Sequence, residues 1–543
     1  MSTPVSQADV EVLVVGCGPV GALTANLLGR RGVTTLVVES SLEPHGQPRA
    51  FSCDDEALRI YQQAGLLAEV RDGMRSAGLV DYTDGAGRPF AQITLSDVDF
   101  GLGYPPLQFF DQPRLEQALR AGLGRFPHVE LRLGVALEAL HADADGVTAR
   151  LRDLTGGRTR QVRARYVLGC DGARSTTRAL AGIELRGSKY EEPWLAVSGD
   201  LPPDAVRLDR TRFVCDWRRP AFVSPAADGG YRLEFMLRAG ETAAQVEQPA
   251  AVAELVAPYV DPQRFQVRRA AVYTFNHLVA ERWRAGRVFL LGDAAHQMPP
   301  FMGQGLCSGL RDAVNLVWKL DLVLGGRAGE PLLDTYEQER RPHTEEMARI
   351  TVQVGRIFLA RSRAGAKLRD VVLRGVQLVP RVRRFVRRFE FKPLPVHRRG
   401  WHVGGRPAGT MFPQPQVAVA GGVGTVPLDE VLGDGFAVVG PAVGPAVAAD
   451  PGWRGLPVRF VRVCAAGSAP GVFDGDYREV ADVDGRLAQW FARHGAGLAV
   501  LRPDRFVYAV AAEGAPSEPL SRTLAAALAA DGRGEAVRPV VRG

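Results

Sequence analysis

Cysteine is scarce in this sequence, and its placement excludes two common uses of the residue. Only six cysteines occur among 543 residues. No two of them form a CxxC pair, and their spacing matches no metal-ligand pattern. We therefore expect neither a disulfide framework nor a metal site, and thiols that stay reduced as small, buried side chains in a cytoplasmic protein. The cysteines are at positions 17, 53, 170, 215, 307 and 464.

Long apolar runs and a strong charge imbalance are absent as well. No run approaches the roughly 20 apolar residues that a membrane-spanning helix needs. The start of the chain, Met1 to Pro4, has neither the basic nor the apolar part of a secretory signal. We expect a cytoplasmic protein without a membrane span. The 67 basic and 60 acidic residues give a modest net charge of +7, which suits anionic small molecules better than nucleic acid.

The sequence does contain a strand–loop–helix–strand unit near its beginning. An apolar run leads into Gly16-x-Gly18-x-x-Gly21, and after a helical stretch a second apolar run, 35–38, ends at Glu39. Gly16 allows the tight turn, Gly18 lets the backbone approach a pyrophosphate, and Gly21 lets the helix pack on the strand. Glu39 stands where a carboxylate can bind ribose hydroxyls. The unit predicts a dinucleotide site, since an ordinary glycine-rich turn would not account for Glu39.

Two later loops could face the same nucleotide. A strand-like segment, 165–169, ends at Asp171, although by pattern alone this loop could equally be a capped turn. A second buried segment, 287–291, leads to Asp293 and then to a loop with two prolines and two glycines before a long helix. Backbone N–H groups at such a helix start can stabilise negative charge. The residues of this last loop include Pro299, Pro300, Gly303, Gln304 and Gly305.

The middle and the end of the chain differ from this pattern. Short strand-like segments between 186 and 270 predict an antiparallel sheet, inserted as a second domain that forms one wall of a pocket. Residues 346–400 are helical and basic, and the apolar positions of 381–389 share one helix face. We expect this face to pack on the protein, with contact to a membrane or to nucleic acid as the alternative. From about residue 404 the composition shifts to Gly, Ala, Val and Pro, which predicts a third domain. Four arginines of the inserted sheet could face the pocket, and alternation alone does not say which: Arg212, Arg218, Arg219 and Arg232.

In this order the three loops resemble those of the class A flavoprotein monooxygenases, the single-component FAD-dependent aromatic hydroxylases. The resemblance covers about residues 1–345. Within this family the chain is similar to the enzymes that hydroxylate 3-(3-hydroxyphenyl)propanoate, in segments such as 54–59, 232–236 and 272–274. The end of the chain is similar to the thioredoxin-like domain of the longer members. Since it has no CxxC pair, we expect this domain to serve packing or oligomerisation.

The resemblance implies an α/β fold. A Rossmann-like FAD-binding domain would carry an inserted antiparallel-sheet substrate domain, as in p-hydroxybenzoate hydroxylase, and a thioredoxin-like C-terminal domain would follow. The expected divisions are 1–185 and 273–345 for the FAD-binding domain, 186–272 for the substrate domain, 346–403 for a helical linker and 404–543 for the C-terminal domain.

The resemblance also implies roles for individual residues. Gly16, Gly18, Gly21 and Glu39 would bind the ADP half of FAD, Arg49 and Gln112 would contact the cofactor along its length, Asp171 would belong to a loop that meets FAD and NAD(P)H, and Asp293 would hold the ribityl chain. Pro300, Gly303, Gln304 and Gly305 would line the flavin ring near the oxygen site. Tyr273 could reach the phenol as a catalytic group, with a core tyrosine as the alternative reading.

The implied reaction is hydroxylation of a small aromatic substrate with NADH or NADPH and O2, through a C4a-hydroperoxyflavin. A phenolic acid of the 3-(3-hydroxyphenyl)propanoate type is the expected substrate, and an aromatic polyketide is the alternative. Two other classes stay open: a flavin oxidase that needs no NAD(P)H, and a non-catalytic FAD-binding protein, which would not need the ordered loop before the long helix. The resemblance also allows a homodimer.

Overall fold

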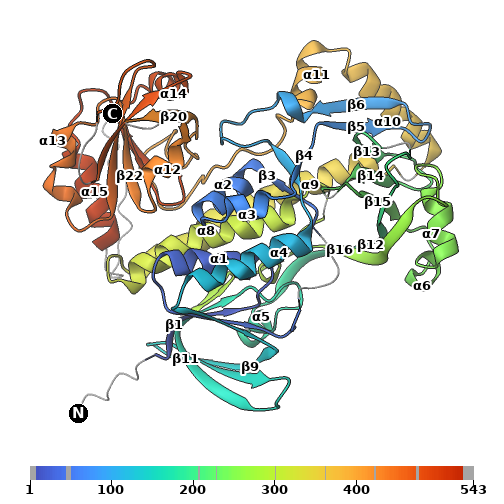
Figure 1. Ribbon diagram of the computed structural model, residues 1–543, viewed down its shortest axis with the longest axis horizontal. Coiled ribbons are helices and arrows are strands. Elements are labelled where there is room, and N and C mark those ends of the chain that lie inside the picture. Colours follow the sequence, from blue (N-terminus) through green and yellow to red (C-terminus); the bar gives the residue numbers. More distant parts are fainter. Residues whose placement is uncertain are drawn as a thin grey trace.

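The computed structural model describes residues 8–43, 50–205, 208–227, 229–299, 301–360, 362–420, 424–471 and 476–529. Figure 1 shows a C-terminal domain at one end of the molecule and a broad sheet at the other, with the long helix α8 (Gln304–Leu324) between them. The dinucleotide-type unit lies below this helix in that view.

The first sheet has a parallel centre in the order β18-β11-β1-β2-β8. Its strands are so apolar because helices cover one face and an antiparallel hairpin the other. Hairpins near residues 145 and 156 join β9 to β10 and β10 to β11. The strands are β1 (Val10–Val15), β2 (Thr35–Glu39), β8 (Val129–Leu133), β9 (Val135–Ala142), β10 (Val147–Asp153), β11 (Thr159–Gly169), β17 (Arg284–Ala285) and β18 (Val288–Leu290).

The second sheet is the expected antiparallel one, and it is larger than the predicted insert of 186–272. It continues through residue 280, and it also takes in a hairpin from 79–94 that pairs in parallel with β13. Its order is β19-β16-β12-β15-β14-β13-β5-β6. The strands are β5 (Leu79–Thr83), β6 (Pro89–Thr94), β12 (Leu185–Asp200), β13 (Thr211–Val214), β14 (Ala221–Pro225), β15 (Tyr231–Met236), β16 (Gln266–Ala280) and β19 (His296–Gln297).

The C-terminal sheet is mixed, in the order β21-β20-β24-β23-β22-β25-β26. Its thioredoxin-like character stays a prediction. A small three-stranded sheet has the order β3-β7-β4, with β3 (Ser52–Asp54), β7 (Leu107–Phe109) and β4 (Arg75–Ser76). The C-terminal strands are β20 (Gln416–Val419), β21 (Val426–Pro427), β22 (Phe436–Gly440), β23 (Val458–Cys464), β24 (Tyr477–Asp482), β25 (Leu498–Leu501) and β26 (Val507–Ala511).

Helix α8 organises the core, because it contacts α1, α2 and α9 along most of its length. Its neighbour α9 runs unbroken from Pro331 to Phe358, so the expected boundary at 345 falls inside one helix. The other helices are α1 (Pro19–Arg30), α2 (Asp55–Gln63), α3 (Leu67–Arg71), α4 (Gln112–Ala121), α5 (Thr176–Leu180), α6 (Ala243–Val246), α7 (Pro249–Val256), α10 (Arg363–Val376), α11 (Pro380–Arg387), α12 (Leu428–Leu432), α13 (Pro445–Ala448), α14 (Arg486–His494) and α15 (Glu518–Ala529). Within the described ranges, no helix is both long and apolar enough to cross a bilayer.

Candidate functional site

A cavity of about 1460 Å³ joins the first sheet to the second. Its lining runs from the glycine loop after β1, past the start of α8, to one face of the second sheet. The carboxyl ends of parallel strands and the wall of the inserted sheet therefore open into one space, as expected for a ligand site between domains.

The glycine loop has the geometry of a phosphate cradle. Gly16 adopts φ +96°, and a Cβ there would lie 2.5 Å from the carbonyl oxygen of Cys170. A Cβ on Gly21 would lie 1.9 Å from the oxygen of Gly16, so this glycine lets α1 pack against the loop. A Cβ on Gly18 would meet nothing within 4 Å, which leaves room for a ligand above the first turn of α1. The free N–H groups of that turn face negative charge favourably.

Glu39 lies at the end of β2, beside the glycine loop. Its Oε2 accepts from the backbone N of Cys17 (2.8 Å) and its Oε1 from that of Ser41 (2.9 Å), and the residue lines the cavity. These contacts fix the carboxylate at the position expected for a ribose partner.

Helix α4 adds a polar edge to the same end of the cavity. Gln112 Oε1 accepts from the backbone N of Ala50 (2.9 Å), and its Nε2 donates to Glu116 (2.8 Å). One turn further, Arg120 Nε donates to the carbonyl of Cys17 (3.1 Å). Gln112, Glu116 and Arg120 all line the cavity. Their spacing of four residues places them on one helix face, a signal in the sequence that could have revealed Arg120 as a site residue.

The carboxylate of Asp171 braces its own loop. It accepts from the hydroxyl of Ser175 (2.5 Å) and from the backbone N of Thr177 (2.8 Å). Arg178 then donates to the carbonyl of Ala294 (3.0 Å), which ties this loop to the one that carries Asp293. Both acids line the cavity, and Asp293 is half-buried. The predicted cofactor role of Asp171 would therefore be served by loop backbone that its side chain holds in place.

The loop before α8 ends in a left-handed turn at Gly303 (φ +65°), where a Cβ would lie 2.6 Å from the hydroxyl of Ser52. Gly303, Gln304 and Gly305 line the cavity at the N-terminus of the helix. Gln304 is buried, and its Oε1 accepts from Arg311 (3.1 Å). The N-terminus of a 21-residue helix thus faces the space where the predicted flavin ring would lie.

A buried ion network holds this end of α8. Arg311 donates to Glu56 (2.5 Å) and contacts Asp54, while Lys392 contacts Asp55 (2.8 Å). The acidic start of α2 in the sequence therefore serves as a set of partners for α8 and for a distant lysine. Because breaking a buried ion pair is costly, the network fixes the helix start against α2.

The wall formed by the second sheet contains buried charge. Arg232 Nε donates to Glu234 (2.9 Å), and the phenol of Tyr273 lies close enough to both side chains for their charges to act on it. Burial raises the pKa of Tyr273 well above its usual value; Glu234 raises it further and Arg232 lowers it. The phenol of Tyr273 therefore stays protonated at neutral pH, which suits a hydrogen-bond donor and argues against a general base.

The strand register places a polar row across this wall. Ser198 on β12 is paired with Arg232 on β15 and with Arg269 on β16, so the three side chains share one face. All three line the cavity. Burial lowers the pKa of Arg269, and the neighbouring Arg232 lowers it further. The row spans about 10 Å across three strands, and next to it Phe213 and Phe222 pack edge to face (5.0 Å).

The structure shows which of the predicted arginines reach the cavity. Of the four candidate arginines, Arg232 alone lines this cavity, whereas Arg218 and Arg219 pair with Asp216 and Glu241. Arg212 alternates with the cavity-lining Thr211 and Phe213 and is 41% exposed. Arg49 and Pro300 lie outside the described residues. Arg269 could not be identified from the alternation of residues in the sequence, because only the strand register shows which face of the sheet it occupies.

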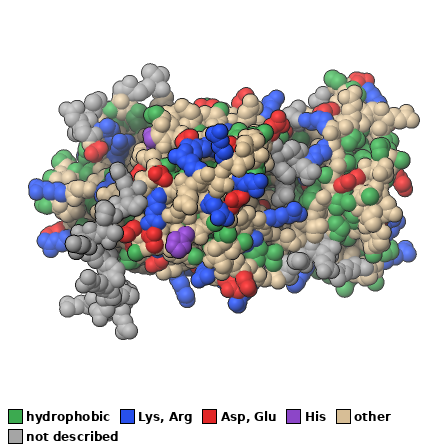
Figure 2. Space-filling view, turned by 90° about the horizontal axis from the view of Figure 1, so that it is seen from below, with side chains coloured by type: hydrophobic (Ala, Val, Ile, Leu, Met, Phe, Trp, Pro, Cys, Tyr) green, Lys and Arg blue, Asp and Glu red, His purple; other side chains and the backbone are tan. Residues whose placement is uncertain are grey.

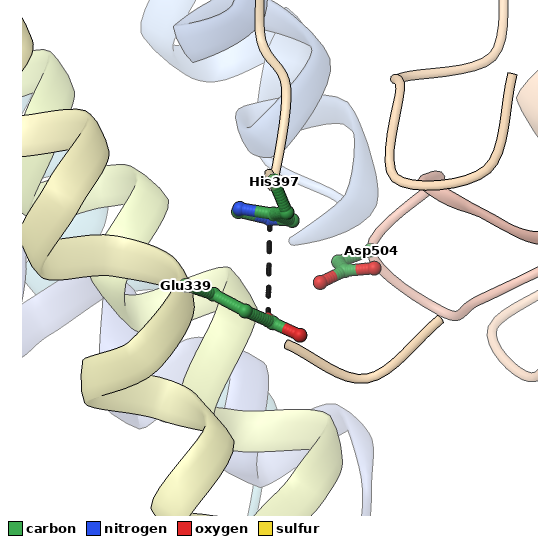
Figure 3. Close-up of side chains that lie close together, drawn as sticks. All are labelled: Glu339, His397 and Asp504. Atoms are coloured by element: carbon green, nitrogen blue, oxygen red, sulfur yellow. Dashed lines mark ion pairs between the residues drawn. The ribbon is translucent and has the colours of Figure 1, made fainter. Parts of the chain in front are cut away.

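A second group of acids and a histidine lies far from this cavity. Glu339 on α9, His397 and Asp504 bring possible ligand atoms within 4.8 Å of one another (Figure 3). However, Lys319 donates to Glu339 (2.8 Å), and Arg502 donates to both Glu339 (2.7 Å) and Asp504 (2.9 Å). Two cations already neutralise the two carboxylates, so the group suits an internal ion network better than a metal ion.

His296 belongs to a buried cluster behind the loop of Asp293. Its Nε2 lies 2.6 Å from Asp312, which also accepts from the backbone N of Gly292 (3.1 Å) and from Arg340 (3.0 Å). Burial alone would raise the pKa of Asp312, but His296 and Arg340 bring it below the usual value. This cluster fixes the loop that carries Asp293.

Comparisons with known proteins agree with this geometry. A family model described as FAD binding domain matches residues 9–351, and one described as HcaD C-terminal domain matches residues 409–527. A Mycobacterium sp. (strain JLS) protein named 3-(3-hydroxy-phenyl)propionate/3-hydroxycinnamic acid hydroxylase is 40% identical over 519 residues, which are 93% of this chain and 90% of that protein. A protein of the same name from Klebsiella pneumoniae (strain 342) is 37% identical over 525 residues, 94% of this chain and 93% of that one.

A solved structure supports the fold. The flavin-dependent monooxygenase PieE, in complex with FAD and substrate, superposes with a TM-score of 0.78 at 22% identity, over 96% of this chain and 99% of that one. The cradle at Gly16 and Gly18, the carboxylate of Glu39 and the α8 N-terminus fit FAD in one continuous cavity. The chain therefore belongs to the family of FAD-dependent aromatic hydroxylases.

Proposed function

We propose that the protein uses NADH or NADPH and O2 to hydroxylate a phenol with an anionic side chain, of the 3-(3-hydroxyphenyl)propanoate type. The observation that carries this proposal is the polar row Arg232–Ser198–Arg269 in the cavity wall. The row brings two guanidinium groups to the wall of one cavity, and a guanidinium group can bind a substrate carboxylate through two parallel hydrogen bonds. The names of the relatives point to the same substrate class.

The residues of the chain divide the work along the cavity. Bound FAD supplies the acceptance of hydride and the activation of O2. The glycine loop, Glu39 and Arg120 hold the nucleotide end, and the loop at Asp293 and Gly303 holds the other end. The N-terminal N–H groups of α8 stabilise negative charge on the ring beside them.

The second sheet would orient the substrate. Arg269 and Ser198 would bind the carboxylate, while the protonated phenol of Tyr273 would donate a hydrogen bond to the substrate. Phe213 and Phe222 would exclude water from the space beside the substrate ring. The six cysteines are free thiols and five of them are buried, which suits a protein of the reducing cytoplasm.

The test compares a charged substrate with its neutral analogue. Purified yellow protein is assayed for NADH and NADPH oxidation with 3-(3-hydroxyphenyl)propanoate, with the corresponding propanamide, and with neither. We expect stimulation by the acid, a dihydroxylated product, and a kcat/KM at least tenfold lower for the amide. Bleaching of the flavin by the phenol alone, without NAD(P)H, would contradict the proposal and indicate an oxidase. Preference for the neutral compound would indicate a substrate without an anionic group.

A further inference from the structure

The two helices that follow α9 form an arm whose exposed surface is not explained by the hydroxylase site. We define the arm as residues 362–388, which include α10 and α11. Figure 1 shows it at the edge of the second sheet, beyond β5 and β6. The sequence predicted that the apolar positions of 381–389 would pack on the protein. Val382, Val386 and Phe389 are indeed half-buried, but Phe385 is 44% exposed.

The larger exposed apolar surface lies on α10 and in the turn after it. Leu368 is 66% exposed, Val371 67% and Leu378 81%, and Val372, Val376 and Val379 are exposed as well. The spacing of 368, 371, 372 and 376 places these side chains along one helix face. The opposite face is the packed one: Ala366 is buried, and Arg374 bonds to Asp84 (2.6 Å). The arm is therefore fixed to the protein while it presents an apolar stripe to solvent.

The charge around this stripe is of one sign. The arm holds nine Lys or Arg and one acid, Asp370, which gives it +8. This exceeds the +7 of the whole chain, so the remaining residues are close to neutral. Asp370 is paired with Arg369 (2.7 Å). Seven cations of the arm are exposed: Arg363, Lys367, Arg381, Arg383, Arg384, Arg387 and Arg388.

We propose that the arm docks the enzyme on an anionic phospholipid surface, with its apolar stripe in the interface and its arginines at the headgroups. An exposed apolar stripe between cations is the pattern of a helix that lies on a membrane, and anionic headgroups attract such basic segments. A second copy of the chain fits less well, because a twofold contact would bring the two sets of cations together. Nucleic acid would pair with the cations but would leave the apolar stripe in water.

The rest of the surface offers a matched control. The face seen from below in Figure 2 carries Lys and Arg interspersed with Asp and Glu. The β10–β11 hairpin contributes four exposed arginines, of which Arg150, Arg158 and Arg160 serve as the control. A triple change to glutamine there removes the same charge as the triple change Arg381→Gln, Arg383→Gln and Arg384→Gln in the arm.

The test is sedimentation of the FAD-loaded full chain with vesicles of phosphatidylcholine, alone or with phosphatidylglycerol, at low and high salt. We expect binding to the anionic vesicles at low salt, at least tenfold weaker binding for the arm triple variant, and unchanged binding for the hairpin variant. A stripe variant, Leu368→Gln with Val371→Gln, should also bind at least fivefold more weakly. Flavin absorbance and circular dichroism confirm that each variant is folded.

Two outcomes would overturn the proposal. One is an absence of binding to anionic vesicles at low salt, or equal losses in the arm and hairpin variants. The other is a dimer of the wild type, seen by analytical ultracentrifugation, that dissociates in the stripe variant while vesicles have no effect; the stripe would then be a contact between copies. Neither outcome bears on the hydroxylase activity, which is measured separately in solution.

Discussion

Arg232 and Glu234 form a buried ion pair in the wall of the cavity, and Arg502 forms another with Glu339 and Asp504 between α9 and the C-terminal domain. Both use the same side-chain types, and both are removed from water. They differ in what reaches them. The first network opens into a cavity of about 1460 Å³ beside Ser198 and Arg269. The second is sealed by packed aromatic rings such as Trp318 and Trp401 (5.5 Å).

Burial of a charged group is therefore not enough, in this fold, to identify a functional site. Perturbed titration occurs in both networks: burial lowers the pKa of Lys319 to about 8, although Glu339 raises it. Arg502 and Lys319 outweigh the burial of Glu339 and hold its pKa well below the usual value. A shifted pKa therefore marks a functional site only where a ligand can also arrive. The C-terminal network instead joins the domain to α8 and α9 (Figure 3).

The largest effect is expected for Arg502→Met. The change leaves Glu339 and Asp504 buried without their main partner, and it should lower the free energy of unfolding by about 3–5 kcal/mol. Urea unfolding followed by tryptophan fluorescence measures this loss. In the folded protein the KM for the phenol should stay within about twofold of wild type, since the network does not touch the cavity. If the variant does not fold, Glu339→Gln serves as the milder change. A shift in KM without a loss of stability would mean that the network of Arg502 acts on substrate binding and does not stabilise the fold.

The next largest effect is expected for Arg269→Gln. Loss of a charged hydrogen bond to the substrate carboxylate costs about 1.5–3 kcal/mol, which raises KM by about tenfold to a hundredfold. The unfolding free energy should change little, and kcat for the acid should be retained at saturation. Steady-state kinetics with the acid and the amide separate these terms, because the amide should lose no affinity. Arg212→Gln, on the opposite face of the same sheet, is the control and should behave as wild type.

A smaller effect is expected for Tyr273→Phe. Removal of its hydroxyl takes away the proposed donor to the substrate, and kcat/KM should fall by about fivefold, the equivalent of one neutral hydrogen bond. The pH dependence of kcat between pH 6 and 9 should keep its shape, because the pKa of Tyr273 lies well above its usual value of 10. Disappearance of one limb of the wild-type profile in the variant would instead identify Tyr273 as a catalytic base.

The smallest effect concerns pH and Lys319. Its pKa in the folded protein, about 8, lies below the usual 10.5, so between these values the unfolded chain binds more protons. Stability from this residue therefore rises as pH increases from 8 toward 10.5. The difference in unfolding free energy between wild type and Lys319→Met, measured by urea titration at pH 7.5 and 9.5, should shift in favour of wild type at the higher pH. A constant difference would mean that Lys319 titrates normally.

Much of this site could be predicted from local patterns in the sequence. The turn at Gly16, the acid at Glu39 and the loop before α8 could be predicted because each depends on neighbours within one βα unit. The starts of α2 and α4 also carry local signals: α2 has acids in its first turn, and α4 has a proline there. These features need no knowledge of distant residues.

The remainder depended on long-range contacts that a single sequence does not display. Arg269 could not be assigned to the cavity before the pairing with Ser198 fixed its face. The hairpin of β5 and β6 joins the second sheet only by pairing with β13, more than a hundred residues later. Likewise, the bonds that Asp54 and Glu56, at the start of α2, accept from Arg311 appear only in the folded chain.

We propose that this cavity brings O2 and a phenolic acid together at a bound flavin. The most direct test of this proposal is a reaction of the FAD-loaded protein with NAD(P)H, 3-(3-hydroxyphenyl)propanoate and ¹⁸O2, with the product analysed by mass spectrometry. We expect a dihydroxylated acid that carries one ¹⁸O atom for each O2 consumed. A product without the label, or O2 consumed only to hydrogen peroxide with the acid unchanged, would contradict it.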